Sequence, residues 1–391
     1  MRPQHHDAIV VGSGLTGLAA ALGLARAGLA VLVVGAEREP EPLDAPWDAR
    51  IYAVAPGSVE LLRTLGAWRE MPSTRVQPVA GMEVFGDRPG TPPLVFDAID
   101  SGAEALAYIA EAGAMQRALW HVLARESGVS VRVPARPARI EVAADRAVLT
   151  FEDGSRALAP LVVGADGARS WVRDAAGIPV RSRAYDQTGV VANFAAEHPH
   201  GDVARQWFRD DGILAMLPLP GNHVSMVWSA FEPWAQELLA LTDEARCEQL
   251  RTVTGDRYGA LRQTGPALGF PLRWMDARRY VQPRLALVGD AAHNVHPLAG
   301  QGVNLGFRDV RALADVMAAR GPEHDPGALP LLRRYERSRR EDVATMIAVT
   351  DGLKRLFGSR APGMAWLRNA GLTFVGQLPL LRHGLARQVL V

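Results

Sequence analysis

Apolar and polar positions follow two rhythms along the chain, and the first rhythm opens it. Residues 7–11 are mostly apolar, residues 15–27 are apolar at helical spacing after a glycine-rich break, and residues 30–34 are apolar again. This order predicts strand, helix and strand, with a first strand buried on both faces of a parallel sheet. We therefore expect a Rossmann-like βαβ unit at the start of the chain.

A second rhythm, with a period of two, fills the middle of the chain. Short runs separated by Gly, Asp and Pro predict a second, antiparallel sheet, over residues 147–151, 190–194, 204–208 and 223–229. We assign this sheet to the substrate. A helix is predicted before it over residues 111–127, and a buried strand over 285–288 followed by a helix over 303–319 returns the chain to the first domain. Residues 331–391 are rich in arginine, and their pattern predicts a mainly helical stretch.

Composition narrows the class of protein. The 391 residues are 48% hydrophobic, enough for two closely joined domains. Lys and Arg number 43 and Asp and Glu 42, so the net charge of +1 leaves no electrostatic footprint for nucleic acid, and we expect none as a partner. The single cysteine, Cys247, excludes an internal disulfide and a Cys-rich metal site.

The start of the chain predicts its compartment. The first six residues form a short polar segment that leads directly into a predicted apolar strand. This segment lacks the apolar core of a signal peptide. No run reaches the roughly 18 apolar residues that a membrane-spanning helix needs. We expect a cytoplasmic protein.

The first chemical motif is the sequence G-S-G-L-T-G at residues 12–17, between a predicted strand and a predicted helix. Gly12 permits a tight turn, Gly14 lets the backbone approach a pyrophosphate, and Gly17 lets the helix pack on the strand. This context favours dinucleotide binding over a turn used only for packing, and it leaves FAD and NAD undecided.

The acid that usually binds the adenosine ribose is missing from this motif. The second strand ends in Gly35, where Asp or Glu is expected. Glu37 lies two residues further on and is one candidate for the ribose hydroxyls. A solvated acid beside Arg38 is the alternative interpretation.

A second motif spans residues 161–170, where an apolar strand ends in Asp166 and Gly167. Asp166 can accept hydrogen bonds from the turn, and Arg169 and Arg173, on a predicted helix, can meet a phosphate or a nicotinamide pyrophosphate. Taken alone, the segment fits a strand-end Asx turn with surface arginines equally well.

The third motif covers residues 287–309 and is the most specific. Asp290 directly follows a buried strand, where a carboxylate needs a partner, and the hydroxyls of a ribityl chain would satisfy it. Gly300 and Gly302 let backbone N–H groups approach a ligand at a helix start. This arrangement suits the N1–C2=O edge of an isoalloxazine, which becomes anionic on reduction.

Two histidines in this motif, His293 and His296, invite a metal interpretation. No Cys or further carboxylate stands at ligand spacing, so we expect no metal site.

Together these motifs resemble the p-hydroxybenzoate hydroxylase class of flavoprotein monooxygenases and, within it, the ubiquinone-biosynthesis hydroxylase family. The likeness spans nearly the whole chain. Beyond the three motifs it rests on Asp48-Ala-Arg50 with Ala53 and Ser58, on Tyr185-Asp-Gln187, and on residues 212–218.

The resemblance implies that Arg50, Gln116, Asp166 and Asp290 contact FAD and that residues 300–304 line the flavin ring. With the motif positions derived above, the expected cofactor-binding residues are Gly12, Ser13, Gly14, Thr16, Gly17, Glu37, Arg50, Gln116, Asp166, Gly289, Asp290, Pro297, Gly300, Gln301, Gly302, Val303 and Asn304.

The implied fold is α/β, a Rossmann-like FAD-binding domain with an interleaved, mainly antiparallel β substrate domain and a C-terminal helical region. The first would comprise residues 1–72, 100–180 and 282–352. The second would comprise 73–99 and 181–281, and the last 353–391.

The implied reaction is hydroxylation of an aromatic ring, on a polyprenylated phenol of ubiquinone biosynthesis, with NAD(P)H and O2 through a C4a-hydroperoxyflavin. The protein must hold the ring in line and exclude water, and the apolar run 213–219 is the expected roof of that cavity. No residue stands out as a catalytic base.

Alternatives stay open at this stage. The same fold can host another flavin oxidoreductase, or the chain can be a non-catalytic scaffold of a quinone-biosynthesis assembly. The C-terminal region fits either a packed helical cover or a surface that rests peripherally on the inner membrane, from which a polyprenyl substrate is drawn.

Overall fold

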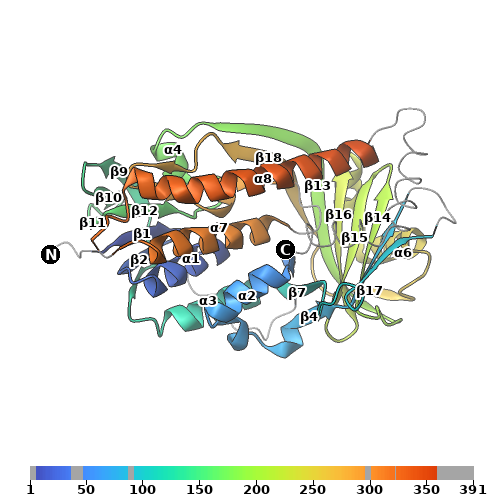
Figure 1. Cartoon of the computed structure of the whole chain (residues 1–391). Helices are drawn as coiled ribbons and strands as arrows, with labels where there is room; N and C mark the ends of the chain where they lie inside the picture. The colour runs from blue at the N-terminus through green and yellow to red at the C-terminus, as the bar shows by residue number, and fades with distance from the viewer. Residues whose placement is uncertain (1–5, 37–46, 87–91, 296–300, 322, 359–391) are drawn as a thin grey trace.

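A computed structural model of the chain describes residues 6–36, 47–86, 92–295, 301–321 and 323–358 (Figure 1). One part of the fold, the Rossmann-like part, is built on a six-stranded sheet in the order β19-β20-β12-β1-β2-β8. All its pairs are parallel except β19 with β20. In chain order the strands are β1 (Ala8–Val11), β2 (Val31–Val34), β8 (Val129–Arg132), β12 (Leu161–Gly164), β19 (Val281–Gln282) and β20 (Leu285–Leu287).

Helices cover this sheet, as the helical spacing predicted. The packed set consists of α1 (Leu15–Arg26), α3 (Ala112–Leu123), α7 (Gln301–Ala318) and α8 (Leu329–Gly358), with α7 lying against both α1 and α8. The shorter helices are α2 (Pro56–Thr64), α4 (Trp171–Ala175), α5 (Trp234–Ala240) and α6 (Asp243–Thr254). Residues 17–24 of α1 are all buried, which explains why that helix carries almost no polar face.

The other part of the fold is a nine-stranded sheet in the order β21-β18-β13-β16-β15-β14-β5-β6, with β17 beside β13 (Figure 1). It is antiparallel, as expected, except for the parallel pair β14 and β5. Its strands are β5 (Gly81–Phe85), β6 (Leu94–Asp97), β13 (Val180–Ala196), β14 (Val203–Arg209), β15 (Gly212–Leu219), β16 (His223–Phe231), β17 (Leu261–Gln263), β18 (Leu268–Ala277) and β21 (His293–Asn294).

Two three-stranded sheets complete the fold. One has the order β11-β10-β9 and the other β3-β7-β4. Their strands are β3 (Ile51–Val54), β4 (Val76–Val79), β7 (Ala107–Glu111), β9 (Pro137–Val142), β10 (Ala147–Phe151) and β11 (Arg156–Ala159). Three-residue or four-residue 3-10 turns occur at Ala67–Glu70, Ser73–Arg75 and Gly289–Ala291.

The assignment of residues 147–151 to the substrate sheet is wrong. The strand exists as β10, but it pairs with β9 and β11. Its buried residues Ala147, Leu149 and Phe151 join the hydrophobic core around the six-stranded sheet. The alternating pattern identified which face is buried, whereas the choice of partner strands depends on tertiary packing. The domain boundaries drawn from the sequence stay a prediction.

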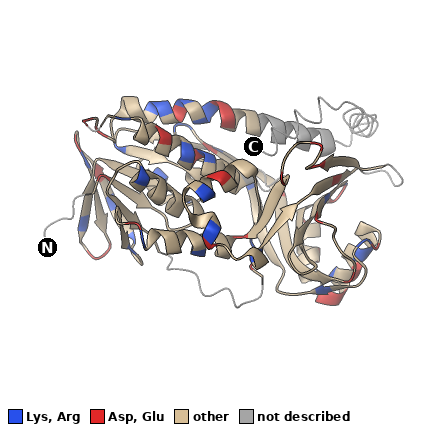
Figure 2. Ribbon diagram, turned by 60° about the horizontal axis from the view of Figure 1, so that its bottom comes forward, with Lys and Arg blue, Asp and Glu red and all other residues tan. Residues whose placement is uncertain are grey.

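Lys and Arg are mixed with Asp and Glu along the outer helices (Figure 2). Among the helices in the described ranges, none is both long and apolar enough to cross a membrane. The predicted C-terminal helical stretch begins as α8, and residues 359–391 lie outside the described part of the chain.

Candidate cofactor and active site

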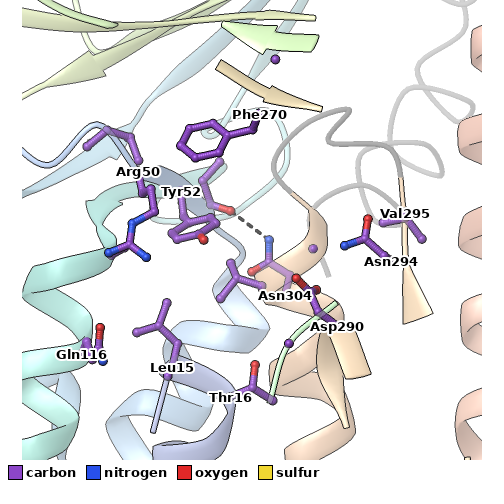
Figure 3. Close-up of a pocket in the computed structure, with 18 of the residues that line it drawn as sticks. Leu15, Thr16, Arg50, Tyr52, Gln116, Phe270, Asp290, Asn294, Val295 and Asn304 are labelled. Atoms are coloured by element: carbon purple, nitrogen blue, oxygen red, sulfur yellow. Dashed lines mark hydrogen bonds between the residues drawn. The ribbon is translucent and has the colours of Figure 1, made fainter. Parts of the chain in front are cut away.

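A cavity of about 960 Å³ lies where the carboxyl ends of the parallel strands meet the nine-stranded sheet. Figure 3 shows residues from distant segments facing it, with Leu15, Thr16 and Gln116 on one side and Phe270 opposite. The predicted residues that line it are Gly12, Ser13, Gly14, Thr16, Arg50, Gln116, Asp166, Asp290, Gly302, Val303 and Asn304. The three sequence motifs therefore converge on one site.

The glycine-rich turn brings bare backbone to the cavity. Gly12 has a φ of +126°, and a Cβ there would lie 2.2 Å from the Ala165 carbonyl oxygen. A Cβ on Gly17 would lie 2.0 Å from the Gly12 oxygen, so this glycine serves packing and does not line the cavity. A Cβ on Gly14 would meet nothing within 4 Å, because it faces open space. The start of α1 is thus free to receive a pyrophosphate.

Asp290 places a carboxylate in the cavity, on the 3-10 turn after β20 (Figure 3). The sequence suggested an enclosed carboxylate, but the Asp290 side chain is exposed to the cavity. The surrounding protein atoms still remove enough solvent from the carboxylate to raise its pKa. Within the described ranges no side chain or backbone group donates a hydrogen bond to it. Such a carboxylate fits the hydroxyls of a ribityl chain.

Asp309, on α7, holds this turn in place through a hydrogen bond to its backbone. The sequence did not single it out as a site residue. Its carboxylate is fully buried and accepts a hydrogen bond from the Gly289 N–H at 2.8 Å. His293 Nε2 lies 2.7 Å from one oxygen, and Arg339 Nε lies 2.6 Å from the other. Burial would raise the pKa of Asp309, but His293 and Arg339 together lower it below its ordinary value. Gly289 itself is part of this support and does not line the cavity.

Asn304 connects α7 to β3. Its Nδ2 donates to the Ala53 carbonyl at 2.9 Å, the dashed line in Figure 3, and its Oδ1 accepts from the Ala55 N–H at 2.9 Å. Both ends of the amide therefore hold the strand that forms one cavity wall. Asn304 lines the cavity, and its amide positions backbone there.

Tyr52, on the strand that Asn304 holds, is a cavity residue that the sequence analysis missed. Figure 3 shows its ring between Arg50 and Asn304. Burial raises the pKa of its phenol, and the negative charge of Asp290 raises it further. Its hydroxyl is therefore a neutral donor at ordinary pH. The only signal in the sequence was its place two residues after Arg50.

Three further predicted residues line the cavity, and they differ in what their side chains contact. Gln116 is buried and its Nε2 donates to the Ser13 carbonyl at 3.0 Å, so it supports the glycine-rich turn. Arg50 has 54% of its side chain exposed, and its Nη2 lies 3.6 Å from a carboxylate oxygen of Asp48. Asp166 accepts hydrogen bonds from Ser170 Oγ and from the Val172 N–H, as its Asx-turn interpretation predicted.

The expectation for the two arginines after Asp166 is wrong in part. Arg169 lies in a turn, because α4 begins only at Trp171. Arg173 does lie on α4, but it is buried and donates to the carbonyls of Ala168 and Ala291. Its guanidinium is used inside the protein and is not presented to a phosphate. The adjacent Asp174 pairs with the Arg173 Nε at 3.2 Å, and the bond to Ala291, 118 residues away, is a tertiary contact that the local pattern does not encode.

Four predicted residues lie wholly or partly outside the described part of the chain. Glu37, Pro297 and Gly300 lie outside the described residues, as does the side chain of Gln301. His296, of the metal hypothesis, is also outside, and His293 pairs with Asp309. Among the described side chains no group of three or more His, Cys, Asp or Glu residues is arranged to share a metal ion.

The nine-stranded sheet supplies the opposite, mainly apolar wall. Of the predicted roof, Ala215 and Leu217 line the cavity. The alternate residues Leu214 and Met216 are fully buried in the core on the other face, as the period of a strand requires. Phe270 lines the cavity and is 42% exposed, so it stands at the mouth.

Comparison with known proteins identifies the group that this site fits. The sequence profile of the family described as FAD binding domain matches residues 5–350. The chain is 38% identical to the ubiquinone hydroxylase UbiL of Rhodospirillum rubrum, over 96% of this chain and 87% of UbiL. It is 37% identical to the 3-demethoxyubiquinol 3-hydroxylase of Escherichia coli, over 98% of both.

Solved structures give the same result for the fold. PqsL of Pseudomonas aeruginosa, described as a probable FAD-dependent monooxygenase, superimposes with a TM-score of 0.78 at 25% identity, over 95% of this chain and 100% of PqsL. The α/β architecture expected from the sequence is confirmed. The chain belongs to the FAD-binding-domain family of flavin-dependent monooxygenases, among the homologues of the ubiquinone-biosynthesis hydroxylases.

Proposed function

We propose that this protein hydroxylates the aromatic ring of a polyprenylated phenol in ubiquinone biosynthesis, with bound FAD, NAD(P)H and O2. The observation that carries the proposal is a cavity with two unlike walls. One wall holds the glycine-rich turn, Asp290 and Asn304, and the other holds apolar strand residues such as Ala215 and Leu217. The names of two curated relatives, UbiL and the 3-demethoxyubiquinol 3-hydroxylase, supply the substrate class.

The polar wall is suited to holding FAD. The start of α1 would receive the pyrophosphate, Asp290 the ribityl hydroxyls, and Gly302 to Asn304 the flavin ring. Bound FAD would supply the redox and oxygen-activating chemistry. The residues of the chain orient and enclose the two reactants.

The apolar wall is suited to an aromatic ring. Packing against Ala215, Leu217 and Val227 would align the ring and exclude water, which protects an oxygen-transfer reaction from unproductive decay. Tyr52 is the phenolic donor at the boundary of the two walls and would orient the hydroxyl of the substrate. No described histidine lines the cavity, so we assign no catalytic base.

The mouth of the cavity offers a route for a long apolar tail. Phe270 and Leu268 on β18 are exposed to 42% and 39%, and Phe270 also lines the cavity. A polyprenyl chain leaving the site would cover this apolar surface. Peripheral contact with a membrane, and with other proteins of quinone biosynthesis, belongs to the same proposal.

The proposal is tested with protein reconstituted with FAD and given a short-chain prenylphenol, O2, and either NADH or NADPH. We expect oxidation of one nicotinamide and a product heavier by one oxygen atom, detected by mass spectrometry. A yellow protein that oxidises nicotinamide without adding oxygen would indicate another flavin activity. A colourless protein that does not take up FAD would indicate the scaffold interpretation.

A second test uses cells that lack the gene. We expect them to accumulate a polyprenylphenol that lacks one hydroxyl, and the position of that hydroxyl names the ring carbon oxidised. An unchanged quinone profile would contradict the pathway assignment.

A further inference from the structure

The end of β2 lacks the acid that most dinucleotide-binding βαβ units use for the adenosine ribose. In such units an Asp or Glu about 20 residues after the first glycine accepts hydrogen bonds from the ribose hydroxyls. In this chain the position is Gly35, which lines the cavity together with Ala36. A glycine has no side chain that could make the contact.

The position of Ser13 explains why residue 35 is a glycine. A Cβ built on Gly35 would lie 2.3 Å from Ser13 Oγ, 2.6 Å from Ser13 Cβ and 3.0 Å from the Ser13 nitrogen. Two carbon atoms of unbonded residues do not approach so closely. Ser13 is itself buried, with 4% of its surface exposed, and has little room to move aside. Any side chain at position 35, an acid included, is therefore excluded while serine occupies position 13.

A neighbouring segment brings another acid to the same end of the cavity. The Ala135 N–H donates to the Gly35 carbonyl at 2.7 Å, and the Glu152 N–H donates to the Arg136 carbonyl at 3.1 Å. This chain of backbone hydrogen bonds joins the end of β2 to the turn after β10. Ala135, Arg136 and Glu152 all line the cavity beside Gly35.

The Glu152 carboxylate is available to a ligand. The side chain is exposed, and within the described residues it takes part in no hydrogen bond or ion pair. The adjacent Asp153, by contrast, is occupied by Arg132 and by Ser155. Glu152 is thus an uncommitted carboxylate at the end of the cavity where the adenosine of a dinucleotide belongs.

We propose that Glu152 binds the adenosine ribose hydroxyls of FAD and replaces the strand-end acid that the Ser13–Gly35 pair excludes. The inference rests on FAD binding and not on the proposed hydroxylation, so each can fail without the other.

The first experiment measures the dissociation constant of FAD for the apoprotein by flavin fluorescence. Glu152→Gln is expected to raise it about tenfold, the effect of losing one hydrogen bond to a charged group. The matched control is Glu141→Gln, an exposed acid of the same small sheet outside the cavity, and it should leave the constant unchanged. Glu37→Gln is measured in parallel. A loss of affinity in that variant, with Glu152→Gln unaffected, would overturn the proposal.

The second experiment identifies the ribose as the partner. ADP, 2′-deoxy-ADP and 3′-deoxy-ADP compete with FAD for the wild-type protein, and at least one deoxy analogue should compete several-fold less well than ADP. In Glu152→Gln the analogues should compete equally. If the variant still discriminates against the same analogue, Glu152 does not bind the ribose.

The third experiment tests the exclusion at position 35. Gly35→Glu alone should lose FAD affinity, because the new side chain meets Ser13. Adding Ser13→Gly should restore affinity and make it insensitive to Glu152→Gln, since the strand-end acid is then present. Tight FAD binding by Gly35→Glu alone would refute the steric argument.

Discussion

The Gly289 N–H donates to the buried carboxylate of Asp309 at 2.8 Å, across 20 residues of sequence. This hydrogen bond fixes the turn that presents Asp290 to the cavity. Because Asp309 also pairs with Arg339 of α8, the C-terminal helix is joined to the same turn. A buried ion network of this kind is stable only while every member is paired.

Asp309→Asn should therefore weaken both folding and cofactor binding. Removing the charge leaves His293 and Arg339 without their carboxylate, which we expect to lower the free energy of unfolding by about 3–5 kcal/mol. Urea unfolding and FAD titration measure the two effects. Asp315→Asn, at an exposed position of the same helix, is the control and should change neither. Unaltered FAD affinity in Asp309→Asn would show that the turn does not depend on this carboxylate.

The stability contributed by His293 should depend on pH. Burial alone would lower the pKa of His293, but the Asp309 carboxylate at 2.7 Å raises it above 6.5, and Asp290 raises it further against the opposing charge of Arg339. A raised pKa in the folded state means that the stabilisation is fully present below pH 6.5 and is lost as pH rises through the folded value. The difference in unfolding free energy between wild type and His293→Gln should shrink with rising pH. A difference that grows with pH would contradict this assignment.

Asp290→Asn should separate binding from folding. The carboxylate has no donor among the described residues and its pKa is raised by burial, so its ionised form is disfavoured in the folded protein. Without FAD, we expect the variant to be as stable as wild type or more so at neutral pH. With FAD, the stabilisation gained by wild type should be reduced. Thermal unfolding of both proteins with and without FAD measures this, and full retention of FAD by the variant would disprove the assigned ribityl contact.

Tyr52→Phe should affect substrate and not cofactor. The substitution removes only a hydroxyl that faces the cavity, so FAD affinity and melting temperature should stay near wild type. Loss of one hydrogen bond to the phenol should raise KM about tenfold, and poorer alignment should increase NAD(P)H oxidation without product. The ratio of product to nicotinamide consumed is the decisive measurement. Unchanged coupling and KM would remove Tyr52 from the substrate site.

Much of the site was accessible from sequence because local backbone rules create it. A glycine-rich turn between a strand and a helix, and an acid directly after a buried strand, have the same meaning in any Rossmann-like fold, and Gly12, Gly14 and Asp290 all reach the cavity. Three of the four period-two runs, 190–194, 204–208 and 223–229, fall in strands of the nine-stranded sheet for the same reason.

The errors and omissions concern partners distant in sequence. The β10 strand was recognised but assigned to the wrong sheet. Arg173 was interpreted as a phosphate contact or a surface arginine, but it is buried and donates to the carbonyl of Ala291, 118 residues away. Tyr52 carried no signal beyond its place two residues after Arg50, because its role depends on Asn304 holding its strand at the cavity.

The sequence by itself determined the βαβ start, the bare glycines and the missing acid at Gly35, since these depend on backbone conformation and on residues next to one another in the chain. Only the tertiary structure decided that Ser13 occupies the space beside Gly35, that Glu152 lies at the same end of the cavity, and that Asp309 supports Asp290. Steric exclusion and the pairing of buried charges act between atoms that folding brings together, and a linear pattern does not contain those distances.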